Sequence, residues 1–546
     1  MPARPLVLPP VRLLPPDELA RQALAAPLLD HALRLVRWTG DERPVDGYGD
    51  LLEDDLAAAA AELGLAGEEG ADEAALAWAV ALDTGLLALE LPEGAGKEGG
   101  PEPSGTAAGR AVPGEVYRRL GADLLARGAD DETTDPHELL DLWLETAESA
   151  LTGAALPGGP LAEGEDDALS AAGVGVGEGF QDVEDDEDLL DVAEENGELL
   201  DAAMVNLYAF TALAGGEQEE RPLAPGEAAG GGGAPVPLPV LAASLVVPEE
   251  VGQPSEEVLD EVTEVIFRLD GLFHLLDSTG LLEYEPLDEA LVEEADGPEG
   301  AEPGPGWDGA AASAAGAEDL TPEELARYGT VRLTPLGLYG LRERLLEAGA
   351  HVPVLGDLAD APAADLLDAL PGYPVPALRA EAAGWAEGRE PDSAARELLA
   401  AGLGSDAEGP GRRLACREVL ELLGPDAEPA VREALAEPEL AGLARSWLER
   451  AGAGDLPAPS PEAARWLAVD TLAARIHADE DPEDLAAAVT ETTAADPRFA
   501  EDGWRVDHPA AAAVLEAVGR LHPDRATAKQ ARKAAFKARS RQGTSA

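Results

Sequence analysis

A seven-residue motif occurs twice in the chain, and it constrains the fold more than any other feature. Thr84–Glu90 (TGLLALE) and Thr279–Glu285 (TGLLEYE) agree at five of seven positions. Each copy follows a helical pattern that ends at a glycine, as helix C-termini often do, and each then reads as a strand. A segment rich in Gly, Pro and Glu comes next, over 92–108 in the first copy and 292–318 in the second. The repetition predicts two copies of one module built from helices and a strand hairpin.

Helical periodicity precedes the motif in both copies and follows it in the second. The apolar stripe of Val258–Leu276 is interpreted as a core face rather than a coiled-coil seam. Thr334 suits a helix N-cap, and Pro335 suits the first helical position. The expected elements are helices over 29–40, 52–63, 72–84, 187–214, 236–247, 258–276 and 335–346, and returning strands over 109–112 and 329–333.

This order of helices, strand, loose tip and returning strand resembles the winged-helix family over roughly 20–115 and 187–350. The stretch VRLTPLGLYGLRERLL, residues 331–346, is similar to the passage from wing to helix in many bacterial members. The resemblance implies two winged-helix-like α+β modules with long disordered wings.

Winged-helix proteins often bind DNA by placing their third helix in the major groove, with basic residues beside it. Here the third helix of the first copy contains no Lys or Arg, and that of the second has Arg268 against seven carboxylates. Because affinity for DNA depends on cations that release counterions, we expect architectural or protein-binding modules. Direct DNA contact remains the alternative, with Arg110, Arg327 and Arg332 as its first candidates.

From about residue 355 the chain consists of short helical patterns separated by Gly, Pro and Asp, without a convincing strand. Leu414–Gly424 (LACREVLELLG) and Gly442–Gly452 (GLARSWLERAG) align at an offset of 28 residues. The pair resembles a HEAT-type helical repeat, which implies a surface for other macromolecules. A generic helical bundle is the alternative. Further helices are expected near 376–388, 392–402, 461–476, 482–494 and 509–521.

The charge balance is strongly acidic, with 109 Asp and Glu against 38 Lys and Arg and a net charge of -71. Three of the four lysines nevertheless lie near the C-terminus, where Lys529, Lys533 and Lys537 would share one face of a helix over 526–538. The candidate contact residues of this basic arm are Arg525, Lys529, Arg532, Lys533, Lys537, Arg539 and Arg541.

The basic arm has two interpretations. It is a phosphate-binding arm for nucleic acid, or it is a solvated tail or a tail docked on the protein's own carboxylates. We favour the second interpretation, because the field of so acidic a chain opposes the approach of nucleic acid.

No constellation of residues for catalysis, cofactor binding or metal binding stands out. His137–Glu138 lacks the second histidine of a zinc-protease helix, and the glycine run 173–179 does not fit a phosphate loop. The acidic run 182–195 lacks the EF-hand glycine, so it is interpreted as solvated, with loose cation binding as the alternative. Cys416 is the single cysteine, which excludes an intramolecular disulfide and a multi-thiolate zinc site. We expect it to behave as a small apolar residue.

The opening residues contain prolines where a signal peptide needs an uninterrupted apolar helix. The longest apolar run, 234–248, is shorter than the roughly 20 residues of a membrane span. We therefore expect a cytoplasmic protein without a membrane partner. Abundant Ala, Gly and Pro, with Arg far above Lys, resemble the acidic multidomain proteins of high-GC bacteria.

Together these features predict a mainly α-helical protein whose leading function is a non-enzymatic, regulatory or protein-interaction scaffold. A nucleic-acid-binding regulator and an enzyme with a site assembled from scattered carboxylates are the alternatives. The expected domains are a winged-helix-like module (1–115), a helical and acidic low-complexity linker (116–186), a second winged-helix-like module (187–350), a HEAT-like helical region (351–522) and a basic C-terminal tail (523–546).

Overall fold

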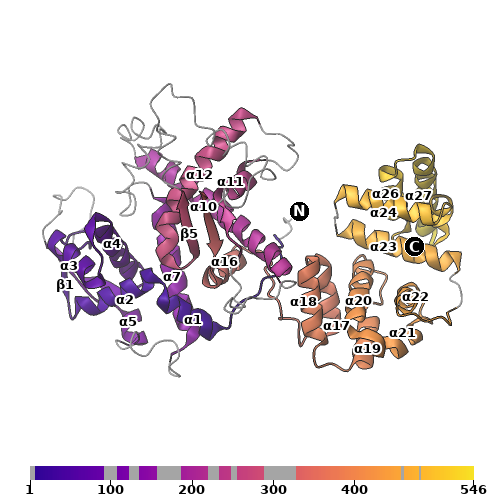
Figure 1. Ribbon diagram of the computed structural model, residues 1–546, viewed down its shortest axis with the longest axis horizontal. Helices are drawn as coiled ribbons and strands as arrows, with labels where there is room; N and C mark the ends of the chain where they lie inside the picture. Colours follow the sequence, from indigo (N-terminus) through magenta and orange to yellow (C-terminus); the bar gives the residue numbers. More distant parts are fainter. Residues whose placement is uncertain are drawn as a thin grey trace. The chain divides into compact units, whose positions relative to one another are not determined.

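The computed structural model of the chain is mainly helical, with two small antiparallel sheets, which confirms the expected mainly α class (Figure 1). It divides into two compact units, one formed essentially by residues up to 352 and one by residues from 353 on. Among the described residues, no helix combines the length and apolar character needed to cross a lipid bilayer. The described residues are 6–90, 107–121, 124, 134–156, 186–218, 233–247, 255–287, 327–456, 460–478 and 481–545.

The first unit contains two modules in which six elements follow one another in the same order: helix, strand, helix, helix, strand, strand. In the first module these are α2 (Pro27–Thr39), β1 (Arg43–Val45), α3 (Glu53–Leu63), α4 (Gly67–Asp83), β2 (Leu87–Glu90) and β3 (Gly109–Pro113). In the second they are α10 (Asp186–Gln218), β4 (Val236–Pro237), α11 (Leu238–Val246), α12 (Glu256–Leu276), β5 (Leu282–Leu287) and β6 (Tyr328–Leu333).

Sheet order is also the same in both modules, since the last strand lies in the centre: β1-β3-β2 and β4-β6-β5. The helices and returning strands expected from the sequence are confirmed, whereas the short strands β1 and β4 were not expected. The expected wings over 92–108 and 292–318 lie outside the described residues, apart from 107 and 108. The glycine run 173–179 lies outside them as well.

The repeated motif forms the turn from helix to strand in each module. Gly85 and Gly280 have φ values of 68° and 77°, in the left-handed region that favours glycine. The preceding threonines are buried and donate their hydroxyl hydrogens to helix carbonyls, Thr84 to Val80 and Thr279 to Leu276. The two modules therefore use the same local chemistry at corresponding positions.

Helix α7 (Pro136–Ala155) contacts α4 of the first module and α12 of the second. Its Trp143 is fully buried and donates from Nε1 to the backbone oxygen of Thr279 at 2.9 Å. Gly340, on α16 (Pro335–Glu347), leaves room for this ring, because a Cβ there would lie 2.7 Å from it. Since α7 falls within 116–186, part of the expected linker contributes to one core that runs through the whole first unit.

The two ends of the first unit lie side by side. The backbone N–H of Leu8 donates to the oxygen of His351 at 3.0 Å, and the N–H of His351 donates to the oxygen of Leu6 at 2.7 Å. The other described elements of this unit are helices α1 (Pro16–Ala25) and α5 (Glu115–Leu120) and the 3-10 helix η2 (Asp277–Thr279).

The second unit has no strand among its described residues and contains two hydrophobic cores, one over 363–448 and one over 469–538. Leu420 and Leu448, which correspond in the aligned segments, are both fully buried. All five additional helices expected after residue 375 are confirmed. Its helices are α17 (Ala363–Ala369), α18 (Val375–Ala386), α19 (Pro391–Ala401), α20 (Gly409–Leu423), α21 (Glu428–Ala434), α22 (Ala441–Arg450), α23 (Pro461–His477), α24 (Pro482–Ala495), α25 (Phe499–Asp502), α26 (Ala511–Leu521) and α27 (Arg525–Ser545).

Candidate functional site

The basic arm is the helix α27, which packs against α26 and α25 through an alanine face. Alanines recur every three or four residues along this face because α27 needs small side chains to approach α26 closely. Gly519 of α26 adds to the close approach, since a Cβ there would collide with Arg532. The buried alanines are Ala528, Ala531, Ala534, Ala535 and Ala538.

Three of the seven candidate contact residues are engaged by the protein itself. Arg539 forms an ion pair with Glu516, and Arg541 forms one with Asp507 at 2.9 Å. The ammonium group of Lys537 lies 5.1 Å from the ring centre of Trp504, a cation–π distance.

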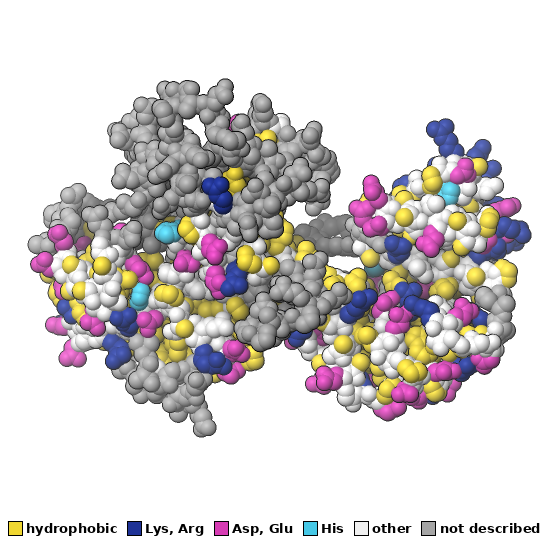
Figure 2. All heavy atoms as spheres, viewed as in Figure 1, with side chains coloured by type: hydrophobic (Ala, Val, Ile, Leu, Met, Phe, Trp, Pro, Cys, Tyr) yellow, Lys and Arg dark blue, Asp and Glu magenta, His cyan; other side chains and the backbone are white. Residues whose placement is uncertain are grey.

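The other four candidates, Arg525, Lys529, Arg532 and Lys533, are exposed. They form no ion pair with any carboxylate of the described residues. Phe536, with 67% of its surface exposed, continues the same helical stripe at spacings of three and four residues. These five residues form the outer face of α27. Figure 2 shows Lys and Arg side chains gathered at the end of the unit where α27 lies.

The inner side of α27 closes a cavity of about 510 Å³ in the second unit. Ala538 and Arg541 line it from α27, and the rest of its wall comes from the starts of α20 and α23 and from loops around 405, 438 and 507. Its residues combine two indole rings with a few charged groups, as small-molecule pockets often do. The aromatic and charged residues that line the cavity, besides Arg541, are Arg413, Glu439, Trp466, Trp504, Asp507 and His508.

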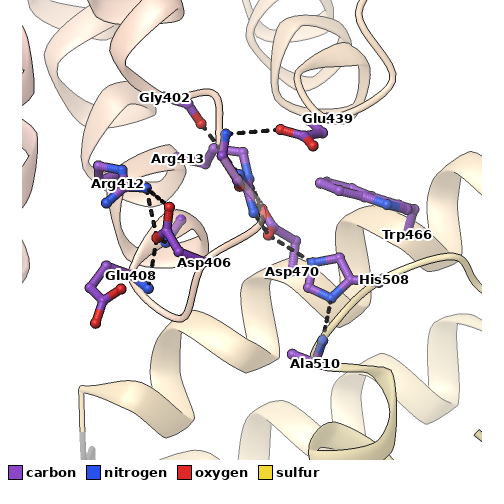
Figure 3. Close-up of polar contacts among 12 residues, drawn as sticks. Gly402, Asp406, Glu408, Arg412, Arg413, Glu439, Trp466, Asp470, His508 and Ala510 are labelled. Carbon is purple, nitrogen blue, oxygen red and sulfur yellow. Dashed lines mark hydrogen bonds and ion pairs between the residues drawn. The ribbon is translucent and has the colours of Figure 1, made fainter. Parts of the chain in front are cut away.

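Arg413 and His508, which line this cavity, belong to a buried network with Asp470 (Figure 3). The Arg413 guanidinium donates from Nε to both oxygens of Asp470, at 3.1 and 3.0 Å, and from Nη2 at 2.6 Å. Its Nη1 donates to the backbone oxygens of Gly402 and Gly404. The three side chains are 3%, 6% and 0% exposed, so the ion pair is shielded from water.

The hydrogen bonds of His508 fix its tautomer. Nδ1 accepts the backbone N–H of Ala510 at 3.0 Å, so the proton of the neutral ring is on Nε2 and is donated to Asp470 Oδ1 at 3.1 Å. The ring also meets Trp466 edge to face, with centres 4.8 Å apart. With both nitrogens engaged, His508 offers no free base to the nearby Ser405, and its part in this arrangement is to orient Asp470.

Two of the three candidate arginines of the hairpins, Arg110 and Arg332, are held by glutamates. Arg110 donates to Glu90, its partner across the strands, and to Glu42 at 2.9 Å. Arg332 pairs with Glu283, its own cross-strand partner. Hydrogen bonding to Glu90 raises the pKa of Arg110 above its usual range. Arg327 is exposed at the start of the returning strand. Contact of Arg110 or Arg332 with phosphate therefore requires that arginine to leave its carboxylate partner.

Cys416 lies fully buried in the first core of the second unit, and burial raises the pKa of its thiol to about 12. Because the thiolate is the reactive form, we expect no reaction with a disulfide reagent in the folded protein at about pH 8 and a single equivalent after unfolding in urea. The chain has one cysteine, so absorbance of the released thiol has one source. Fast labelling without denaturant would contradict this burial.

Among the described residues, no group of three or more His, Cys, Asp or Glu is placed to hold a metal ion.

Asp470 and His508 were not singled out by the sequence analysis. Asp470 lies 57 residues from Arg413 and 38 from His508, so no local pattern connects them. The one available signal is a carboxylate within an apolar stretch, 466–474 (WLAVDTLAA), because a buried Asp usually has a partner.

No protein-family model, curated protein or solved structure matches the chain. The resemblances to winged-helix and HEAT proteins therefore stay interpretations of the sequence pattern. What the chain does has to be inferred from the chemistry of its described side chains.

Proposed function

We propose that the protein is a non-enzymatic regulatory or interaction scaffold that binds an acidic protein segment through the outer face of α27. The main support for this proposal is that four exposed cations have no carboxylate partner among the described residues, although the chain has a net charge of -71. Phe536 adds apolar area between them, which suits a segment with both carboxylates and apolar side chains. Because α27 is already docked through its alanines, binding does not require the ordering of a free arm.

The distribution of charge between the units supports this choice of surface. Residues 1–352 contain 75 Asp and Glu against 17 Lys and Arg, whereas residues 353–546 contain 34 against 21. Repulsion of an acidic partner acts over a Debye length of roughly 8 Å in physiological salt. The second unit is thus where such a partner meets the least opposing charge.

We further propose that the two modules of the first unit are winged helices with an architectural role, and that helices α17 to α22 form a HEAT-like stack. The repeated element order and the central last strand support the first proposal. The equivalent burial of Leu420 and Leu448 supports the second. The carboxylate partners of Arg110 and Arg332 support an architectural rather than a DNA-reading role.

Nucleic-acid binding by α27 alone is the second candidate function. Residues 525–546 contain seven Lys and Arg and no Asp or Glu, which is the electrostatic signature of a phosphate contact. Against it stands the net charge of the whole chain, which opposes a polyanion more strongly than a short acidic segment.

Replacing Lys529 and Lys533 together by Ala tests the scaffold proposal. Alanine keeps α27 helical and removes two cations of the outer face. We expect affinity for a fluorescent peptide of alternating Glu and Leu to fall about three- to tenfold, since exposed pairs contribute modestly. Fluorescence anisotropy of the labelled peptide with the full chain measures this.

The matched control replaces Arg379 and Arg450, two exposed arginines on α18 and α22, by Ala. It removes the same charge and should leave peptide affinity unchanged. A labelled DNA duplex in parallel separates the two functions. Equal loss in both variants, or binding of the duplex in preference to the peptide, would refute the scaffold proposal.

A further inference from the structure

The cavity beneath α27 has a charge that the protein leaves unbalanced. Two ion pairs account for most of its charged groups, Arg413 with Asp470 and Arg541 with Asp507. His508 is neutral in the tautomer fixed by its hydrogen bonds. Glu439 remains, and it has no cationic partner among the described residues. The groups named here therefore sum to one negative charge, carried by Glu439, while the cations of Arg505 and Lys537 lie over the Trp504 ring at 4.5 and 5.1 Å.

The charged donors that line the cavity are already in use, whereas the Ser405 hydroxyl and the Trp504 indole N–H have no hydrogen bond to the described residues. The guanidinium groups of Arg413 and Arg541 donate to carboxylates and backbone oxygens. The indole N–H of Trp466 donates to the backbone oxygen of Asp507 at 3.1 Å, and the ring N–H of His508 donates to the carboxylate of Asp470. An anionic ligand that pairs with either guanidinium group would have to displace these internal bonds, at the cost of leaving a carboxylate unpaired.

Glu439 keeps an acceptor for a ligand. One of its oxygens, Oε2, accepts the backbone N–H of Gly404 at 2.9 Å, which holds the carboxylate at the cavity wall and leaves Oε1 without a hydrogen bond to the described residues. Glu439 is half-buried, so its carboxylate is less screened than one on the open surface. Figure 3 shows Glu439 and Trp466 projecting from different elements toward the region of Arg413.

The other walls are apolar and aromatic. Trp466 and Trp504 supply indole surfaces, and Pro438, Val506 and Ala538 supply apolar area. A volume of about 510 Å³ lies in the range of pockets that enclose a small molecule or one large side chain. Arg413 already lies over the Trp466 ring at 5.3 Å, and Arg505 and Lys537 lie over the Trp504 ring. The unpaired carboxylate of Glu439 therefore favours a cation on an apolar body through charge pairing, and the apolar walls contact the body.

We propose that this cavity binds an organic monocation, a guanidinium or primary ammonium group on an apolar or aromatic stem, with Glu439 as its counter-ion. The same chemistry is presented by a free amine and by an Arg or Lys side chain of a peptide. The site is separate from the outer face of α27 and does not depend on its function.

Calorimetric titration with phenethylguanidinium tests the site, with neutral phenethylurea as the matched ligand of similar shape. We expect the cation to bind with a dissociation constant of about 1 mM or lower and the urea at least about tenfold more weakly. The dipeptide amide acetyl-Phe-Arg-amide shows whether the site prefers the side chain of a peptide or a free amine. Binding tighter than that of the free cation assigns a peptide side chain, and weaker binding assigns a free amine.

The substitution Glu439→Gln keeps an acceptor for Gly404 and removes the charge. We expect it to weaken binding of phenethylguanidinium about tenfold. Glu437→Gln is the control, because Glu437 is exposed, lies two residues away and gives the same change in net charge. This variant should bind phenethylguanidinium with an affinity within about twofold of that of the unaltered chain. Equal affinity for cation and urea, no binding of the cation, or equal loss in both variants would overturn the proposal.

Discussion

Replacing Asp470 by Asn is expected to lower the free energy of unfolding of the second unit by about 3 to 5 kcal/mol. The amide has nearly the shape of the carboxylate, so packing is preserved, but Arg413 then remains as a buried cation without its counter-ion. Urea titration with labelling of Cys416 measures the effect. Cys416 is on α20, the helix that carries Arg413, and it becomes reactive when this unit unfolds.

Two further variants show whether the effect comes from the buried charge. Asp455→Asn removes a carboxylate that also accepts two hydrogen bonds from one arginine, Arg432, but does so at the exposed surface. It should leave the urea midpoint almost unchanged. The double variant Arg413→Met with Asp470→Asn removes the cation as well and should recover much of the lost stability. A double variant no more stable than Asp470→Asn would contradict this explanation.

Replacing Trp143 by Ala is expected to lower the free energy of unfolding of the first unit by about 3 to 5 kcal/mol. The ring is fully buried and packs against α16, and it is hydrogen-bonded to Thr279 at the motif of the second module. Because α7 contacts helices of both modules, protection from hydrogen exchange should fall in both hairpins together. Exchange measured by mass spectrometry on peptides from 87–90 and 282–287 checks this.

Trp143→Phe separates packing from hydrogen bonding at the same position. Most of the ring volume is kept, but the donor to the oxygen of Thr279 is lost, and about 1 to 3 kcal/mol of stability should be lost with it. Loss of protection in the second module alone would show that the two modules do not unfold as one unit.

Most of the elements of the fold could be predicted from the sequence because their signals are local. The repeated motif located both hairpins, and Thr334 with Pro335 located the start of α16, where the Thr334 hydroxyl accepts the N–H of Gly337. Strands β1 and β4 were missed because they are three and two residues long and each contains a proline. Such strands have no period-two pattern of their own and form by pairing with the central strand.

The candidate site could be predicted only in part, because local sequence patterns do not show which distant residues meet in the fold. The helical spacing of the C-terminal lysines predicted a helix over 526–538, which lies within α27, but the buried alanine face that docks this helix was not predicted. Which cations stay unpaired depends on Glu516 and Asp507, and these meet α27 only when it docks. Arg413 looks no different in sequence from its neighbours Arg412 and Arg417, and its burial follows from the packing of α20 on α23.

The hydrogen bonds between Leu8 and His351 have a consequence for how the chain can be rearranged. Residues near the start and the end of the first unit are therefore close enough for a short linker to join them. A circular permutant that joins residue 6 to residue 352 through a short linker, and opens at the turn after Gly64, would keep the whole core intact. Its termini would then lie beside the first module, and the second unit could be exchanged or moved without threading any strand through the fold.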